Sequence, residues 1–395
     1  NFLTAVANGY NYTNGDVYIT NQNNITVAGN NYAAGTYSLT STSGSIIQGN
    51  NALISAYILN LAADNDIGTY SAPIQFDARY LTANAYGDTT MGNVYLTYTG
   101  NYHVYLVGDS YAANNFSLSA PNTDPYWYWG ISVGENTYNP GTVTARGVIT
   151  LASNTAIEGY GGSNSVLSAP TVNLTANVYD IGDDYTVYTR ASTVVATATG
   201  DSGYINIVNN RNTLGSVSVT LNSAGYTSFT NSGDIVVTGS NSAGDYSLTA
   251  NNGSILQGNS GLITAWSINL YADNDIGSSS NSIQLNTTYL TAYANGNQTN
   301  GDVYLNSVGT GPIYLVDSNY ANGVFSLTAS GDINIGDGYW DNGNWGYRSN
   351  YNTHVHAGES ISLTSTNGAI YDNIGWSYGW DGGYDTLVAP SITLS

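Results

Sequence analysis

Short apolar segments alternate with polar positions along the whole chain. In "YSL", "INL", "TYL", "VYL" and "FSL" the apolar side chains fall on every second residue, which is the period of a half-buried strand. Leu248, Leu270 and Leu290 mark three of these segments, at separations of 22 and 20 residues. Turns rich in Gly, Asn and Asp separate them. The pattern predicts stacked coils of about 20–22 residues, each with two or three short strands, which together form a β-solenoid.

The chain also contains a longer repeat. Residues 44–118 align with residues 253–327 without a gap, and 40 of the 75 positions are identical. Weaker copies begin near Val148 and Ile361, so the tandem unit has about 105 residues. We expect one continuous solenoid over 1–395, with a partial unit at 1–36, units at 37–147, 148–245 and 246–360, and a partial unit at 361–395. At about 21 residues a coil, this length gives roughly 19 coils.

The order of the repeats resembles a known family. "SLTANNGSILQG" (247–258), "LITAWSINLYADNDIG" (262–277) and "GDVYL" (301–305) follow one another, and "DIGTYSAPIQF" occurs in the other copy. This order is similar to the shafts of filamentous haemagglutinin-like exoproteins, which are bacterial adhesins secreted by the two-partner route. The resemblance implies an all-β fold that is a right-handed parallel β-helix. It also implies an extracellular location at the cell surface.

Composition agrees with an all-β chain and narrows the choice of partners. The sequence has 36 Tyr, no Lys and only three Glu, which favours strands and leaves few residues typical of helix surfaces. The net charge is −21, and the five Arg are scattered, so we expect no nucleic-acid partner. No apolar run approaches the roughly 20 residues of a membrane span.

The pentapeptide Asp-Asn-Asp-Ile-Gly occurs twice, at 64–68 and 273–277. One interpretation is a turn, in which the Ile enters the core and the Gly adopts a positive φ. The alternative is a calcium site, because carboxylate oxygens are calcium ligands. The candidate ligands are Asp64, Asp66, Asp273 and Asp275. A third copy keeps Asp180, Ile181 and Gly182 but lacks the first Asp, so we predict a turn and no cofactor.

Aromatic residues concentrate in three insertions. Six of the seven Trp lie there, alternating with Tyr and polar residues: Trp127, Trp129, Trp340, Trp345, Trp376 and Trp380. Such Trp- and Tyr-rich loops are typical of surfaces that contact a partner chain or a glycan. The alternative is that they pack on their own shaft. The motif "THVH" places His354 and His356 on one face of a strand, where we expect a solvent-facing pair rather than a metal site.

These features favour a structural function. No Lys is present, and the sequence pairs no acidic residue with a partner, so we expect no enzymatic activity and no catalytic residues. The chain starts and ends in mid-repeat, which predicts exposed strands that stack head to tail on identical copies. We expect a surface or biofilm-matrix fibre, or the shaft of a large secreted adhesin, with other fibre chains and cell-surface glycans as further partners. The alternative is a glycan-binding or polysaccharide-cleaving β-helix.

Overall fold

A computed structural model describes residues 2–9, 15–88, 90–123, 130–210, 215–336, 353–372 and 386–395. Parallel coils stack into a β-solenoid of about 14 turns, which confirms the predicted all-β fold class. The one helix within these ranges is a 3-10 turn, η2 (Gly162–Asn164). None of the described helical segments is long and apolar enough to cross a membrane. Two compact units can be distinguished, Asn1–Asn210 and Arg211–Ser395.

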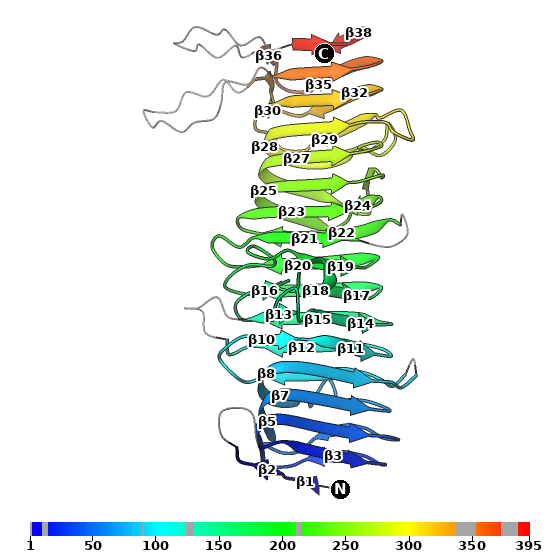
Figure 1. The fold of residues 1–395 in the computed structure, drawn as a ribbon. Helices are drawn as coiled ribbons and strands as arrows, with labels where there is room; N and C mark the ends of the chain where they lie inside the picture. Colours follow the sequence, from blue (N-terminus) through cyan, green and yellow to red (C-terminus); the bar gives the residue numbers. More distant parts are fainter. Residues whose placement is uncertain are drawn as a thin grey trace. The chain divides into compact units, whose positions relative to one another are not determined.

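Each coil of the first unit crosses three faces (Figure 1). Two successive coils show the pattern: β9 (Val94–Tyr98), β10 (Val104–Leu106) and β11 (Gly108–Ala112) are followed by β12 (Phe116–Ala120), β13 (Ile131–Val133) and β14 (Gly141–Ala145). Each strand of the first coil pairs in parallel with its counterpart in the second. Where turns between faces are tight, one long strand bends across more than one face. These long strands are β5 (Asn30–Ser41), β7 (Leu53–Ala63) and β8 (Ile74–Ala85).

The other strands of the first unit complete this pattern. They are β1 (Phe2–Leu3), β2 (Val6–Ala7), β3 (Val17–Asn21), β4 (Ile25–Val27), β6 (Ile46–Gln48), β15 (Val148–Ser153), β16 (Ile157–Glu158), β17 (Val166–Ser168), β18 (Thr171–Ala176), β19 (Val187–Arg190), β20 (Thr193–Ala198) and β21 (Ile205–Asn209). The ladder from β15 through β18 to β20 is parallel and in register throughout.

The second unit is built in the same way. Its strands are β22 (Val217–Ser223), β23 (Tyr226–Asn231), β24 (Ile235–Val237), β25 (Ser240–Ala250), β26 (Ile255–Gln257), β27 (Leu262–Ala272), β28 (Ile283–Ala294), β29 (Val303–Ser307), β30 (Ile313–Leu315), β31 (Ser318–Ala321), β32 (Val324–Ala329), β33 (Ile333–Ile335), β34 (His354–Ala357), β35 (Ser360–Ser365), β36 (Ile370–Asp372), β37 (Thr386–Val388) and β38 (Ser391–Leu394). Its long bent strands are β25, β27 and β28, the duplicates of β5, β7 and β8.

Coil length is regular in some places and extended in others. Leu39 pairs with Leu61, and Leu61 with Ala83, so these coils have 22 residues, as predicted. The step from Ser110 to its partner Val143 is 33 residues, because the loops beside β13 lengthen that coil. Longer coils of this kind make the expected total of about 19 coils wrong, and the chain forms about 14 turns.

The core consists of side chains that alternate with exposed ones and stack on identical or similar residues of the next coil. Leu39, Leu61 and Ala83 form one such buried column. Each buried Leu or Ile contributes about 1.5–3 kcal/mol relative to an exposed one. Because every coil adds to the same columns, its stability depends on the coils before and after it.

Buried asparagines satisfy backbone groups where the chain turns between faces. The Asn241 Oδ1 accepts hydrogen bonds from the Leu221 N–H at 2.8 Å and from the Tyr246 hydroxyl at 3.0 Å. In the first unit, the Asn31 Oδ1 accepts the Tyr37 hydroxyl at 2.8 Å. Among the described residues, no buried side-chain nitrogen or oxygen lacks a hydrogen-bond partner. These asparagines therefore hold neighbouring coils together without leaving a polar atom unsatisfied.

Candidate functional site

The repeated acidic pentapeptide forms a turn at the start of a coil. Gly68 and Gly277 have φ values of 67° and 69°, in the left-handed region that favours glycine. Ile67 is fully buried and forms parallel bridges to Ile46 and Val94, so it links the previous coil to the next. Gly182, in the third copy, has a φ of 78°. The predicted turn geometry is confirmed at all three places.

The second Asp of the motif binds the backbone of the following coil. The Asp66 Oδ1 accepts the Asn93 N–H at 2.8 Å. The corresponding oxygen of Asp275 accepts the Asp302 N–H at 2.9 Å and the Gly301 N–H at 3.0 Å. These N–H groups lie at corners between faces, where the regular ladder is interrupted. A charged acceptor makes such bonds stronger than a neutral one.

The first Asp of the motif has a more peripheral position. Asp64 is exposed. The Asp273 carboxylate is also at the surface, where it accepts the Asn252 N–H at 2.7 Å and the Asn295 amide at 3.2 Å. Within the described ranges, no group of three or more His, Cys, Asp or Glu residues is arranged to hold a metal ion. The calcium candidates thus have backbone and amide partners as turn residues.

We predict that Asp275→Ala destabilises the protein by about 2 kcal/mol or more, because backbone N–H groups of the next coil lose their acceptor. Asp275→Asn keeps the Oδ1 acceptor and should cost clearly less. Thermal unfolding of both variants, with and without millimolar calcium, measures this difference. Equal effects of the two substitutions, or a melting temperature that rises by tens of degrees on adding calcium, would contradict the turn assignment.

A second acidic group lies inside the first unit. Glu158 on β16 is buried, and its Oε2 accepts the Tyr185 N–H at 3.1 Å. Burial raises the pKa of Glu158 to about 8, and the nearby carboxylates of Asp184, Asp180 and Asp183 raise it further. Burial also raises the pKa of Asp180. Glu158 is therefore mostly protonated at neutral pH in the folded protein.

We predict that this glutamic acid makes folding stability fall as pH rises. Between pH 4.5 and about 8 the folded state keeps the Glu158 proton while the unfolded state releases it, so the free energy of unfolding decreases over that window and levels off above it. The total change is on the order of a few kcal/mol. Denaturant unfolding at several pH values, for wild type and Glu158→Gln, isolates this contribution. A wild-type pH dependence identical to that of Glu158→Gln would rule it out.

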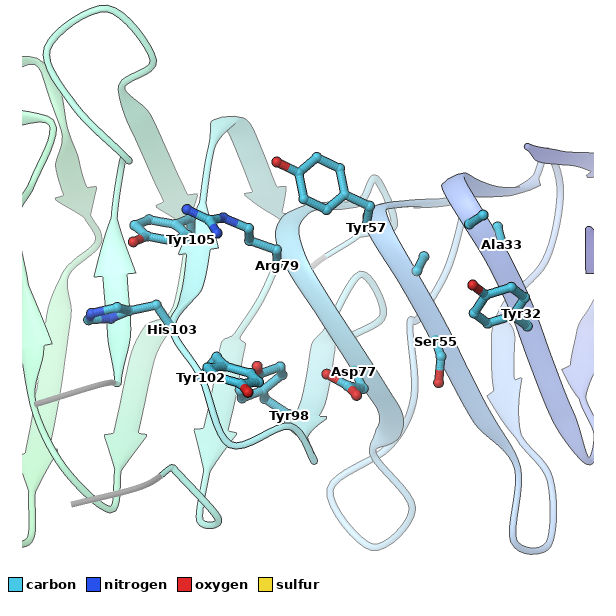
Figure 2. Close-up of a pocket in the computed structure, with 12 residues that line it drawn as sticks. Tyr32, Ala33, Ser55, Tyr57, Asp77, Arg79, Tyr98, Tyr102, His103 and Tyr105 are labelled. Atoms are coloured by element: carbon cyan, nitrogen blue, oxygen red, sulfur yellow. The ribbon is translucent and has the colours of Figure 1, made fainter. Parts of the chain in front are cut away.

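The most developed surface depression lies on the first unit. It has a volume of about 740 Å³ and crosses successive coils from β5 to β10 (Figure 2). Small residues line part of it: Ala33, Ala34, Ser55 and Ala56. Tyr32 borders it at one end, and a cluster around Tyr102 and Tyr105 borders it at the other. We call this depression the tyrosine groove.

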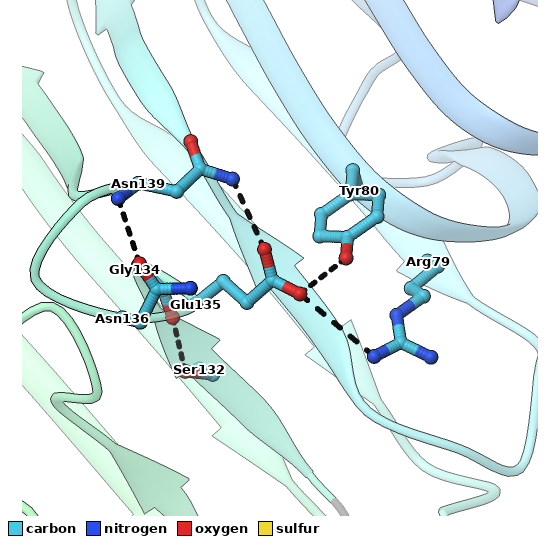
Figure 3. A network of polar contacts seen from close by, with 7 residues as sticks. All are labelled: Arg79, Tyr80, Ser132, Gly134, Glu135, Asn136 and Asn139. Carbon is cyan, nitrogen blue, oxygen red and sulfur yellow. Dashed lines mark hydrogen bonds and ion pairs between the residues drawn. The ribbon is translucent and has the colours of Figure 1, made fainter.

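Charged groups at one side of the tyrosine groove are paired with each other. The Arg79 guanidinium lies 3.9 Å from the Glu135 carboxylate, and the Tyr80 hydroxyl donates a hydrogen bond to the same carboxylate (Figure 3). The guanidinium also lies over the Tyr80 and Tyr105 rings, at 5.5 and 5.4 Å from their centroids. The Asn139 amide donates to the other Glu135 oxygen at 3.2 Å. This network holds the only Arg of the groove lining in place.

Two further titratable groups line the groove. His103 accepts the Gly130 N–H through its Nδ1 at 3.2 Å. Burial, together with the positive charge of Arg79, lowers the pKa of His103 to about 4, so the imidazole is neutral at physiological pH. Burial raises the pKa of Asp77. The groove thus offers hydrogen-bonding groups without a net positive charge.

Stacked aromatic rings run along one outer face beside the groove. Tyr57, Tyr80 and Tyr105 come from three successive coils, with centroid distances of 5.2 and 5.6 Å. The duplicate positions in the second unit are Trp266, Tyr289 and Tyr314, with distances of 5.3 and 5.5 Å. Because the rings recur in both copies at the same spacing, they belong to the repeated structure.

The other residues singled out from the sequence have different outcomes. The six Trp of the insertions, Trp127, Trp129, Trp340, Trp345, Trp376 and Trp380, lie outside the described residues, so their contacts stay a prediction. His354 and His356 are both exposed on β34, as predicted. The His354 Nδ1 lies 2.6 Å from the Thr386 hydroxyl, and the His356 ring stacks on Tyr320 at 5.3 Å.

The fold and these surfaces define a parallel β-solenoid protein with ordered aromatic rows. Comparison of the chain with protein-family models, curated proteins and solved structures found no match in any of the three. The resemblance to filamentous haemagglutinin-like shafts therefore depends on the repeat pattern and is consistent with the parallel solenoid.

Proposed function

We propose that this chain is a structural shaft, either in an extracellular fibre or in the stalk of a large secreted adhesin of the filamentous haemagglutinin-like kind. The observation that carries the proposal is the surface of β38. Its Ile392 and Leu394 pair in register with Ile361 and Leu363, which are buried in the core. Ile392 and Leu394 themselves are 43% and 51% exposed.

A further coil would bury this apolar row and pair the free edge of β38. An exposed strand edge is a template for another strand, and a solenoid offers the same register at each step. The added coil belongs either to a longer polypeptide or to another copy of this chain. Contact between copies would join different surfaces of each, so it would extend as a filament instead of closing into a ring.

The material of the shaft also suits this function. Coil-to-coil columns of Leu, Ile and Val run through each unit, and side-chain oxygens bind backbone groups of the neighbouring coil at the corners. The sequence contains neither Cys nor Lys, so disulfides and lysine isopeptide bonds do not reinforce it. Packing and hydrogen bonding provide the rigidity that a stalk or fibre requires.

We predict that the purified chain assembles end to end in a concentration-dependent way. Ile392→Asp combined with Leu394→Asp places charges in the apolar row and should abolish assembly. Thr393→Asp is the matched control, because Thr393 lies between these residues and pairs with Ser362 on the outward side of the strand. Analytical ultracentrifugation and electron microscopy distinguish filaments from single molecules.

Two results would contradict the proposal. One is a wild-type chain that stays a discrete monomer at high concentration. The other is a double variant that forms filaments as readily as wild type and Thr393→Asp. Each result would mean that the core-register row of β38 does not direct assembly.

A further inference from the structure

The tyrosine groove is a specialised feature of one copy of the repeat. The gapless alignment places Asn286, Thr288 and Gly311 in the second copy where the first has Asp77, Arg79 and Tyr102. The other changed lining residues are Tyr98 and His103, which correspond to Ser307 and Pro312. Both copies nevertheless keep the same coil register and the same ring spacing. The solenoid therefore does not need the polar and aromatic side chains that distinguish the groove.

The shape of the groove selects an extended ligand. Its lining comes from successive coils, with Tyr32 on β5, Tyr57 on β7 and Tyr105 on β10, so its long direction follows the coil stack (Figure 2). Successive coils are about 4.8 Å apart, which is close to the length of one hexose unit in a linear polysaccharide. A chain of sugars lying in the groove would advance by about one unit per coil.

The chemistry of the lining fits the two kinds of surface that a sugar presents. Tyrosine rings pack against the apolar C–H faces of a pyranose and keep a hydroxyl tip for hydrogen bonding. Asp77 supplies acceptor oxygens for sugar hydroxyls, and Arg79 supplies N–H donors. The half-buried position of Asp77 makes an unpaired carboxyl costly, so a ligand with several hydroxyl donors is favoured.

Charge excludes a strongly anionic chain. Glu135 lies beside Arg79 and compensates its charge, His103 is neutral, and the protein carries a net charge of −21. A uronic acid polymer would meet repulsion with no free cation in the described lining to offset it. A proline-rich peptide also suits aromatic grooves, but proline has no N–H to donate to Asp77.

We infer that the tyrosine groove binds a linear, uncharged polysaccharide, which lies along the coil stack against Tyr57, Tyr102 and Tyr105 and is hydrogen-bonded by Asp77 and Arg79. The binding site is independent of end-to-end assembly, because all its residues lie on the side of the first unit. A shaft with such a site would attach to neutral glycans along its length.

Titration calorimetry with defined oligosaccharides tests this inference. The probes are cellohexaose, laminarihexaose and mannohexaose, compared with hexagalacturonate and decaproline. The protein carries Ile392→Asp and Leu394→Asp in every sample, so the outcome does not depend on whether the shaft assembles. We expect at least one neutral hexasaccharide to bind, and neither comparator to bind as tightly.

A groove variant takes its residues from the second copy: Asp77→Asn, Arg79→Thr and Tyr102→Gly together. The same solenoid already accepts these residues at the duplicate positions, so the variant should fold, as circular dichroism will verify. We expect its affinity for the neutral sugar to fall at least tenfold. The matched control, Asn286→Ala with Thr288→Ala in the second copy, should bind as tightly as the parent protein.

Three results would overturn the inference. They are the absence of binding by all three neutral hexasaccharides at millimolar concentration, unchanged affinity in the folded groove variant, and tighter binding of hexagalacturonate or decaproline than of any neutral sugar. The last result would assign the groove to an acidic glycan or a peptide, respectively.

Discussion

Hydrogen bonds from side-chain oxygens to backbone N–H groups at the coil corners are the interaction on which the structure depends. Between corners, parallel ladders satisfy the backbone of each strand. At the corners the chain changes direction and the ladder is interrupted, so the N–H groups there need other acceptors. Asp and Asn supply them, at the outer turns through residues such as Asp66, Asp275 and Asp180, and inside the core through Asn31 and Asn241.

This requirement explains much of the composition. A chain of short strands has many corners, and each corner favours Asp or Asn as acceptor and Gly where φ is positive. Opposite charges are not needed for this task, since the partners of the carboxylates are backbone amides. The protein therefore combines many Asp with few basic residues and still satisfies its described buried polar atoms. The negative charge follows from the architecture as much as from any ligand.

The sequence predicts the repeated features well and the singular ones poorly. Ile67 and Gly68 could be assigned to a core position and a positive-φ turn because the motif recurs. The partners of Asp66 could not, since Asn93 is 27 residues away and is brought close only by the coil length. Coil length itself varies at the loops beside β13, which the average period concealed.

The tyrosine groove was also missed, because its residues come from different coils and form no motif in the sequence. A signal was nevertheless present. Within the duplicated segments, Asp77, Arg79, Tyr102 and His103 are replaced while the strand positions around them are kept. Differences between copies that share one scaffold indicate where a copy has acquired its own chemistry. This comparison needs no other protein, only the correct register between the repeats.

Hydrogen exchange at single amides tests the role of the corner bonds most directly. The corner N–H groups of Asn93, Tyr204 and Asp302 should be protected to within about tenfold of ladder amides such as that of Leu61. In Asp275→Ala, protection should fall at Asp302 while Asn93 keeps its wild-type rate. Corner amides that exchange as fast as those of an unstructured turn, or an Asp302 amide that is unaffected by Asp275→Ala, would contradict this account.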